Sequence, residues 1–271
     1  MPELPEVETT RRGITPHCLN QVVTKIIIRQ PKLRWPIPPQ IKKILPGERL
    51  NAIERRGKYI LLRFNVGTLL IHLGMSGSLR ILPTAVPVEK HDHFDLLFNN
   101  GLCLRFHDPR RFGSILFIKG EPHSHKLLID LGPEPLTDTF NTNYLFDISR
   151  NKTVNIKQLI MNSKIVVGVG NIYASEALFL AGIHPKRSAG KIAKLRYQRL
   201  TEAIKSVLTA AIKQGGTTLR DFTSSDGKPG YFSQQLNVYG REGQPCPQCG
   251  SLIKNIVIGQ RASYYCGKCQ R

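Results

Sequence analysis

The pattern of apolar and polar residues predicts a strand-rich first half of the chain. Short apolar or β-branched runs, and runs in which apolar and polar residues alternate, are typical of strands with a buried face. Such runs cover Lys25–Arg29, Tyr59–Phe64, Thr68–Leu73, Phe94–Phe98, Leu102–Phe106 and Ser114–Ile118. The turn Asn99–Gly101 joins two of them and predicts a hairpin. Several strands at this short spacing predict a sandwich or a barrel-like β domain.

One helix is predicted ahead of the strands, over Pro5–Arg12. Pro5 suits the first helical position, and Glu6 and Glu8 suit the positive N-terminal end of a helix. We expect Gly13 to end this helix.

The second half of the chain has helical periodicity. The stretch Leu131–Leu136 contains prolines and a glycine and indicates the start of an interdomain connection. Two short helices are predicted, Asn155–Met161 and Asn171–Ala181, and a long one ends at Gly215. The apolar stripe of the long helix consists of Leu200, Ile204, Val207, Leu208 and Ala211. The polar, Gly-rich stretch Thr217–Phe232 predicts a long loop, and such loops are often functional.

The charge of the chain favours a polyanionic partner, most simply nucleic acid. The 271 residues carry 39 Lys and Arg against 19 Asp and Glu, which gives a net charge of +20 and a pI near 10.0. Residues 151–271 contribute +13 and residues 1–150 contribute +7, so we expect the C-terminal part to hold phosphates. A generally basic surface kept for solubility and a membrane-binding surface remain weaker alternatives.

Composition excludes other classes of protein. No apolar run approaches the ~20 residues that span a bilayer. The first ten residues lack the pattern of a signal peptide, and a hydrophobic content of 41% is ordinary for a globular chain. We therefore expect a soluble, cytoplasmic protein that does not bind membranes.

Four cysteines near the C-terminus have the spacing of a metal site: Cys246, Cys249, Cys266 and Cys269. Two C-x2-C pairs separated by 16 residues match an all-cysteine tetrahedral zinc site. Because all four positions are filled by protein, the zinc is expected to be structural. A redox dithiol pair is the alternative. The residues between the pairs predict a zinc-ribbon hairpin, Leu252–Ile258 and Ala262–Tyr265, with Arg261 at its tip. Cys18 and Cys103 are expected to be buried as small hydrophobic residues.

The turn Gly168–Asn171 has two interpretations. A GxG before a helix offers backbone N–H groups to a phosphate. Here it follows a helical segment, which argues against a nucleotide-binding loop and suits a clamp for DNA phosphates. A simple helix-capping turn explains the same residues equally well.

The N-terminus could carry chemistry. If Met1 is removed, Pro2 exposes a secondary amine, which can attack an electrophilic sugar carbon and form an iminium. Glu3 would be close enough to transfer protons. On these residues alone, acidic side chains that favour a helix N-terminus are the simpler explanation. Lys58, in a short basic run, has the same standing. His91 and His93 are expected to be structural or phosphate-contacting rather than metal ligands.

Several motifs in order carry a resemblance to a known family. They are PELPEVETTRRG at Pro2–Gly13, HLGMSGSLR at His72–Arg80, KHDH at Lys90–His93, DPRRFG at Asp108–Gly113, then LGPEPL, VGVGNIYASEAL, GIHP, QGGTTLRDF, SDGKPGYF and the four-cysteine hairpin. Over essentially its whole length the chain resembles the bacterial formamidopyrimidine-DNA glycosylases.

The resemblance implies an α+β multidomain fold with an N-terminal β-sandwich flanked by helices, a helical helix–two-turn–helix domain and a C-terminal zinc-ribbon β-hairpin. The corresponding boundaries are a catalytic domain at 1–133, an interdomain linker at 134–150, the helix–two-turn–helix domain with a lesion-recognition loop at 151–236, and the zinc finger at 237–271.

The resemblance also implies base-excision repair of oxidised purines such as 8-oxoguanine, with glycosylase and AP lyase activities. In the family's pattern, Pro2 matches the nucleophile, Glu3 the acid/base residue and Glu6 its supporting carboxylate. Lys58 and Arg261 match residues assigned to β- and δ-elimination. The matching DNA-contacting residues are Met75, His91, Arg110, Phe112, Lys152, Lys157 and Asn171.

The implied partner is double-stranded DNA that contains an oxidised purine, and the implied cofactor is one structural zinc ion per chain. We expect a monomer in the bacterial cytoplasm, associated with the nucleoid. Two other functions are weighed: an endonuclease VIII-type glycosylase for oxidised pyrimidines, and a non-catalytic zinc-ribbon DNA-binding protein. The second leaves Pro2, Glu3 and Lys58 without a role.

Overall fold

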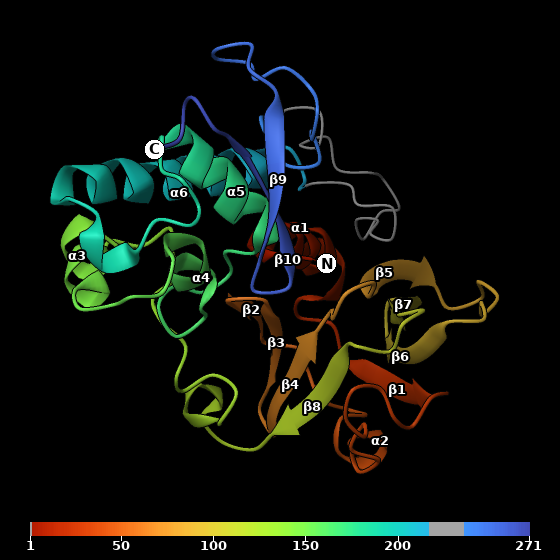
Figure 1. The fold of residues 1–271 in the computed structure, drawn as a ribbon. Helices are drawn as coiled ribbons and strands as arrows, with labels where there is room; N and C mark the ends of the chain where they lie inside the picture. The colour runs from red at the N-terminus through yellow and green to blue at the C-terminus, as the bar shows by residue number, and fades with distance from the viewer. Residues whose placement is uncertain (1, 217–235) are drawn as a thin grey trace. The chain divides into compact units, whose positions relative to one another are not determined.

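The computed structural model describes residues 2–216 and 236–271. These residues fall into two compact units, which are described separately (Figure 1). Unit 1 contains residues 2–129 and 214–216, and unit 2 contains residues 130–213 and 236–271.

Unit 1 is built on two four-stranded antiparallel sheets. The first has the order β1-β6-β7-β5, with β1 at Val23–Ile28, β5 at Ser78–Pro83, β6 at Asp92–Phe98 and β7 at Leu102–His107. The second has the order β2-β3-β4-β8, with β2 at Ala52–Arg56, β3 at Tyr59–Phe64, β4 at Gly67–His72 and β8 at Ser114–Ile118. The predicted hairpin is confirmed, because Phe94 pairs with Phe106 and Leu96 with Leu104. The strands β2 and β5 and the short helix α2 (Ile41–Ile44) were not predicted.

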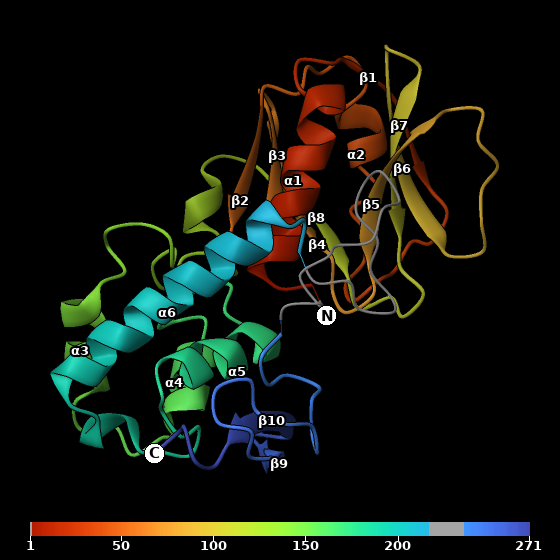
Figure 2. The same cartoon turned by 90° about the horizontal axis from the view of Figure 1, so that it is seen from above.

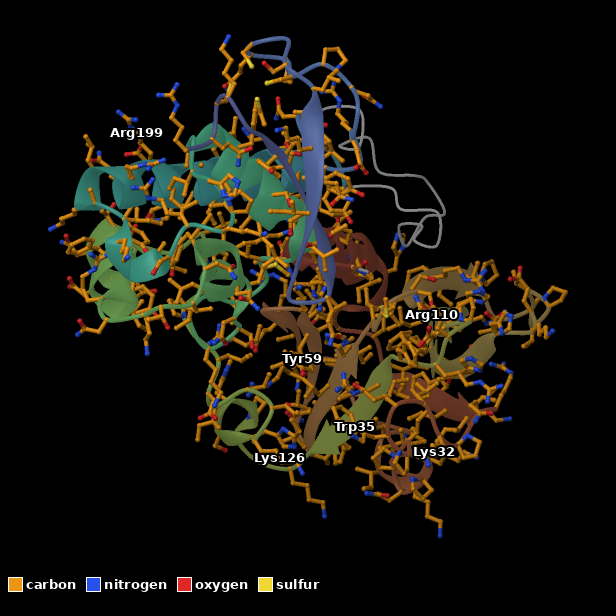
Figure 3. The ribbon with its side chains drawn as sticks, in the orientation of Figure 1. Lys32, Trp35, Tyr59, Arg110, Lys126 and Arg199 are labelled. Atoms are coloured by element: carbon orange, nitrogen blue, oxygen red, sulfur yellow. The ribbon has the colours of Figure 1, made fainter. Side chains whose placement is uncertain are left out.

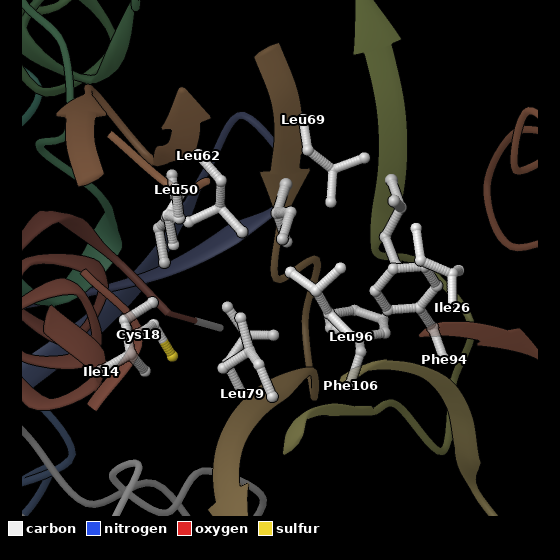
Figure 4. Close-up of a cluster of buried hydrophobic side chains, with 14 of the residues drawn as sticks. Ile14, Cys18, Ile26, Leu50, Leu62, Leu69, Leu79, Phe94, Leu96 and Phe106 are labelled. Atoms are coloured by element: carbon white, nitrogen blue, oxygen red, sulfur yellow. The ribbon is translucent and has the colours of Figure 1, made fainter. Parts of the chain in front are cut away.

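A shared apolar core confirms the sandwich. Leu62 and Leu69 of one sheet join Leu96 and Phe106 of the other in a single buried cluster (Figure 4). Burial of apolar side chains is the main favourable contribution to the free energy of folding, so this cluster stabilises the packing of the two sheets. Cys18 belongs to the same cluster, and Cys103 is also buried, as expected for small hydrophobic residues.

The first helix is longer than predicted. Helix α1 covers Leu4–Cys18, so Gly13 does not end it. Ile14 and Cys18 are fully buried on the same apolar stripe as Val7. Packing of this extra turn outweighs the ~1 kcal/mol that a glycine costs inside a helix.

Unit 2 contains four helices among its described residues: α3 (Thr142–Ser149), α4 (Ile156–Met161), α5 (Asn171–Leu180) and α6 (Lys194–Lys213). Helix α6 runs beside α5 and α3 (Figure 2). We expected a linker over 134–150, but residues 142–149 form α3, because Asn141 caps its N-terminus and Leu145 is buried. Strands β9 (Ile253–Ile258) and β10 (Arg261–Cys266) complete the unit as the predicted hairpin.

Short 3-10 helices lie at Pro122–Ser124 and Ala189–Lys191. Across the described ranges, none of the helices has the length and apolar character needed to cross a bilayer.

Candidate functional site

The N-terminal residues form a buried arrangement at the start of α1. Glu3 is the N-cap residue, and its main-chain N–H donates a hydrogen bond to Glu6 Oε2 at 2.8 Å. The Glu3 side chain in turn accepts from the main chain of Glu6, which completes a reciprocal capping box. Pro2 is buried, and Glu3 and Glu6 are 2% and 1% exposed. The capping interpretation and the catalytic one therefore involve the same carboxylates.

Glu6 also lies against the residue that precedes the predicted loop. Gly216 has a φ of +82°, and a Cβ atom placed on it would be 3.0 Å from Glu6 Oε1. A side chain at position 216 would thus press on the carboxylate and strain the backbone. The loop itself, Thr217–Phe232, lies outside the described residues.

Glu8 holds a structural network on the next turn of α1. Its carboxylate accepts hydrogen bonds from Arg11, Arg12 and Arg55 at 2.8–3.1 Å. Burial alone would raise the pKa of Glu8, but these hydrogen bonds and the positive charges of Arg11 and Arg55 lower it to about 2. Because Arg55 belongs to β2, this network fixes α1 to the sheet.

Three of the residues that were predicted to contact DNA, Met75, Arg110 and Phe112, lie on two adjoining loops of unit 1. Met75 and Phe112 are 36% and 47% exposed and line a common cavity of about 430 Å³. The Arg110 guanidinium lies 5.0 Å from the centre of the Phe112 ring. An exposed apolar side chain beside a cavity is suited to insert between base pairs. We therefore call Met75 and Phe112 the wedge residues, and the cavity that they line the wedge cavity. Arg110 is marked in Figure 3.

The fully buried Asp108 holds these loops together. Its carboxylate accepts from the Ser76 hydroxyl at 2.7 Å and from the Gly113 main-chain N–H at 2.8 Å. Ser76 Oγ also accepts from the main-chain N–H of Arg110 at 3.2 Å. One buried carboxylate therefore orders the loops that carry Met75 and Phe112.

His72 lines the same cavity and was not singled out from the sequence. Its Nδ1 accepts from the Gly74 main-chain N–H at 2.9 Å, and its ring lies 4.9 Å from that of Tyr59. Burial, then the positive charges of Lys58 and Arg34, lower the pKa of His72 to about 4. The charge of Lys58 thus acts on His72, which lines this cavity. The available signal was the position of His72 at the start of the HLGMSGSLR motif.

His91 packs beside two other histidines of unit 1. Its ring makes edge contacts with His93 and His107, at 6.3 and 5.8 Å between centres. His107 Nδ1 is 2.8 Å from Asp92 Oδ1, so Glu89, Asp92 and His107 form an oxygen and nitrogen cluster of the kind that can hold a metal.

The charges around Asp92 oppose a metal there. Arg80 and Arg105 both form ion pairs with the Asp92 carboxylate. These two cations already neutralise it, which favours the structural interpretation of this cluster.

Two residues of unit 2 that were predicted to contact DNA donate hydrogen bonds to the hairpin. Lys157 is 1% exposed, and its ammonium donates to Ser263 Oγ at 2.7 Å and to the Ala262 carbonyl at 3.2 Å. Asn171 Nδ2 donates to the same carbonyl at 3.0 Å. The structure thus brings Lys157 and Asn171 together beneath β10, the strand that begins at Arg261.

Lys152 and Arg261 are exposed. Arg261 pairs with Ile258 at the end of the hairpin and lines a cavity of about 240 Å³ with Lys157. Its predicted place at the hairpin tip is confirmed.

Glu176 is a buried functional candidate that sequence reasoning missed. Its carboxylate accepts from the main-chain N–H groups of Asn237, Val238 and Tyr239 at 2.8–2.9 Å, and from Asn237 Nδ2 at 3.0 Å. Four donors on one carboxylate of 1% exposure fix the start of the C-terminal segment to α5.

The four C-terminal cysteines fit one zinc ion. Their sulfur atoms all lie within 4.8 Å of one another, with 3.9 Å between Cys246 and Cys269 and 3.5 Å between Cys249 and Cys266. A tetrahedron with Zn–S bonds of about 2.3 Å has sulfur–sulfur edges of about 3.8 Å. None of the four is in a disulfide, so the thiolates could bind the ion as a closed structural site.

The predicted site residues are divided between the units. Pro2, Glu3, Glu6, Lys58 and the wedge residues belong to unit 1, and Lys152, Lys157, Asn171, Arg261 and the cysteines belong to unit 2.

Three family models match successive parts of the chain. They are the formamidopyrimidine-DNA glycosylase N-terminal domain at residues 1–115, the formamidopyrimidine-DNA glycosylase H2TH domain at 131–223, and a zinc finger found in FPG and IleRS at 243–271.

Relatives match over the full length. The formamidopyrimidine-DNA glycosylases of Nitrosococcus oceani and Hydrogenovibrio crunogenus are each 58% identical to this chain, covering 100% of it and 100% and 97% of their own lengths. The solved MutM (Fpg) protein of Thermus thermophilus is 37% identical with a TM-score of 0.89, over 99% of this chain and 98% of that one.

Lactococcus lactis Fpg, solved in complex with DNA that contains an abasic site, is 33% identical with a TM-score of 0.92 over 99% of both chains. The identity, the coverage and the order of the three domains agree with the sequence motifs and with the fold. The chain belongs to the formamidopyrimidine-DNA glycosylase family.

Proposed function

We propose that this protein is a bifunctional DNA glycosylase and AP lyase that removes oxidised purines from double-stranded DNA. The observation that carries the proposal is the buried Pro2 beside the Glu3–Glu6 capping box, in a chain that also presents Met75 and Phe112 at one cavity. Full-length relatives are named formamidopyrimidine-DNA glycosylases, and solved neighbours hold DNA with a formamidopyrimidine lesion or an abasic site.

The proposed chemistry begins at Pro2 after removal of Met1. The lone pair of the Pro2 amine attacks C1′ of the damaged nucleotide, the bond from C1′ to the base breaks, and the base leaves as it takes up a proton. Glu3 transfers protons at this centre, and Glu6 holds Glu3 through the capping box. The adduct nitrogen then loses its proton, its lone pair expels O4′ from C1′ as O4′ takes up a proton, and an iminium remains at C1′.

The iminium makes strand cleavage possible because it acidifies the 2′ proton. Removal of that proton expels the 3′ phosphate, and a second elimination expels the 5′ phosphate. We assign Lys58 to the first elimination and Arg261 to the second. The cations next to these leaving phosphates stabilise the charge that develops on them.

The lesion must leave the helix before this chemistry can occur, at a cost of a few kcal/mol. We assign Met75 and Phe112 to fill the space it vacates, and Arg110 to donate hydrogen bonds to the unpaired cytosine. His91, Lys152 and Asn171 are assigned to backbone phosphates, and Lys157 to the support of this region through β10. Because these side chains would replace counterions on the DNA phosphates, we expect the affinity for DNA to fall steeply as the salt concentration rises.

The zinc ion is assigned a structural role and not a catalytic one. Bound by the four cysteines, it would stabilise the hairpin that presents Arg261, and no chemical step requires it. The enzyme would act as a monomer on chromosomal DNA in the bacterial cytoplasm, at the nucleoid.

The endonuclease VIII-type activity on oxidised pyrimidines is not favoured. The experiment compares duplexes that carry 8-oxoguanine opposite cytosine with duplexes that carry thymine glycol. We expect faster excision of 8-oxoguanine, and products with phosphate at both ends of the gap. Preferential cleavage of thymine glycol would support the alternative, and binding without cleavage of either duplex would support a non-catalytic protein.

A further inference from the structure

Arg34 lies on the segment between β1 and α2, and its main chain is hydrogen-bonded to the loop that carries Phe112. Its main-chain N–H donates to the Gly113 carbonyl at 3.1 Å. Its neighbour Leu33 is buried, and the Leu33 N–H donates to the Trp35 carbonyl at 3.1 Å. The backbone of this segment is therefore fixed next to Phe112, although the Arg34 side chain is exposed.

Arg34 also lies at the cavity beside Met75 and Phe112, and His72 lines the same cavity. Its guanidinium lies 4.8 Å from the centre of the ring of Trp35, which is marked in Figure 3. In addition to burial, the positive charges of Lys58 and Arg34 both lower the pKa of His72. Arg34 therefore places a cation at the cavity that Met75 and Phe112 line.

Within the described part of the chain, no carboxylate pairs with Arg34. Nearby arginines differ, because Arg29, Arg80 and Arg105 all form ion pairs with Asp92 or Asp95. A guanidinium whose face rests on an aromatic ring keeps its N–H edge available. That edge matches the two oxygens of a phosphate.

We propose that Arg34, supported by Trp35, binds a backbone phosphate of the DNA directly beside the Met75–Phe112 wedge. This inference rests on the proposed function. This contact would link binding of the DNA backbone to insertion of Phe112, because the Arg34 main chain is hydrogen-bonded to Gly113, the residue that follows Phe112. The alternative occupant of the cavity is an unstacked base, which would give R34Q an unchanged dependence of affinity on salt.

The test compares R34Q and R34K with R49Q. Arg49 is an exposed arginine of the same unit whose guanidinium donates to the Asn20 carbonyl, so R49Q is a charge-matched control. Dissociation constants are measured across a series of salt concentrations, on an undamaged duplex and on one carrying a stable abasic-site analogue.

Loss of one phosphate contact should weaken R34Q on both duplexes and reduce the slope of log K against log salt by about one. R34K should keep the slope and bind more weakly than the wild type, since lysine cannot form the planar fork. R49Q should behave as wild type.

The protein has a single tryptophan, Trp35, which gives a local readout. DNA should change its emission in the wild type, with a smaller change in R34Q at saturating DNA. Unchanged thermal unfolding of R34Q would show that the variant is folded.

A wild-type salt slope in R34Q would overturn the inference. A loss that depends on the base opposite the lesion, at an unchanged slope, would assign the cavity to a base and would overturn it equally. Both results leave the proposed function intact if the wild type still excises 8-oxoguanine. Failure of the wild type to do so is a separate result that refutes the function itself.

Discussion

A Cβ atom placed on Gly74 would lie 2.4 Å from the main-chain carbonyl carbon of Phe112. Gly74 also has a φ of +70°, a conformation that other residues adopt only at a cost. The two loops that carry the wedge residues are therefore in backbone contact, and a side chain at position 74 has no room. The position of Phe112 therefore depends on the absence of a side chain at Gly74.

We expect G74A to destabilise unit 1 by about 2–4 kcal/mol and to weaken binding to lesion-containing DNA, since the backbone of Phe112 must move. Thermal unfolding and an abasic-analogue binding assay measure the two effects. G101A is the matched control, because Gly101 has a φ of +78° with open space around it. It should cost about 1 kcal/mol and leave binding unchanged. Equal effects of both substitutions would refute the backbone-contact argument.

Glu8 should control stability in acid. Its carboxylate pKa is lowered from 4.5 to about 2, so its contribution is complete above about pH 4.5 and is lost as pH falls towards 2. E8Q should lower the free energy of unfolding by about 3 kcal/mol at neutral pH, and the difference from wild type should shrink in acid.

Urea unfolding across this pH range measures the effect of E8Q. The control is E54Q, since the Glu54–Arg63 pair at 3.5 Å is partly exposed and should contribute less than about 1 kcal/mol. A pH-independent difference between E8Q and wild type would contradict the account.

His72 should also make the protein less stable as pH falls, because the folded protein holds this side chain in its neutral form. Its pKa falls from 6.5 to about 4 in the folded protein, so the unfolded chain takes up a proton first as pH falls. The free energy of unfolding should therefore decrease from about pH 6.5 to about pH 4, with no effect above this window. H72N keeps an acceptor for the Gly74 N–H and does not titrate, so its stability should change less across the window. An identical pH profile for wild type and H72N would show that His72 is not the titrating group.

Glu176 should control how firmly zinc is held. It fixes the main chain at Val238, which packs with Cys246 and Cys266 in one buried cluster. E176Q replaces an acceptor oxygen with an amide that faces N–H donors, which costs about 1–3 kcal/mol. Zinc transfer to a coloured chelator should be several-fold faster. E202Q, on the exposed face of α6, should release zinc at the wild-type rate, and a wild-type rate for E176Q would refute this link.

The sequence predicted the elements whose signal is local. The strand runs, the hairpin at Asn99–Gly101 and the zinc hairpin all depend on alternation or on fixed spacing, and each is present. The end of α1 was wrong because burial of Ile14 and Cys18 comes from the tertiary fold. Strand β5 begins inside the motif that contains Met75, and its pairing with β7 is not visible in a local pattern.

The site was predicted largely through resemblance, and long-range contacts are what the sequence did not contain. Glu176 and Val238 are 62 residues apart, and no periodicity connects them. Lys157 looked like one more basic contact residue, whereas its buried ammonium binds Ser263, 106 residues away. The roles of Pro2, Glu3, Lys58 and Arg261 stay predictions.

The most direct test of the central claim is borohydride trapping on a duplex with 8-oxoguanine opposite cytosine, followed by mass mapping of the linked peptide. We predict a covalent adduct on the amine of Pro2, with Met1 removed, and no adduct in a variant that retains Met1. An adduct that maps to a lysine, or excision of 8-oxoguanine without any trapped species, would contradict it.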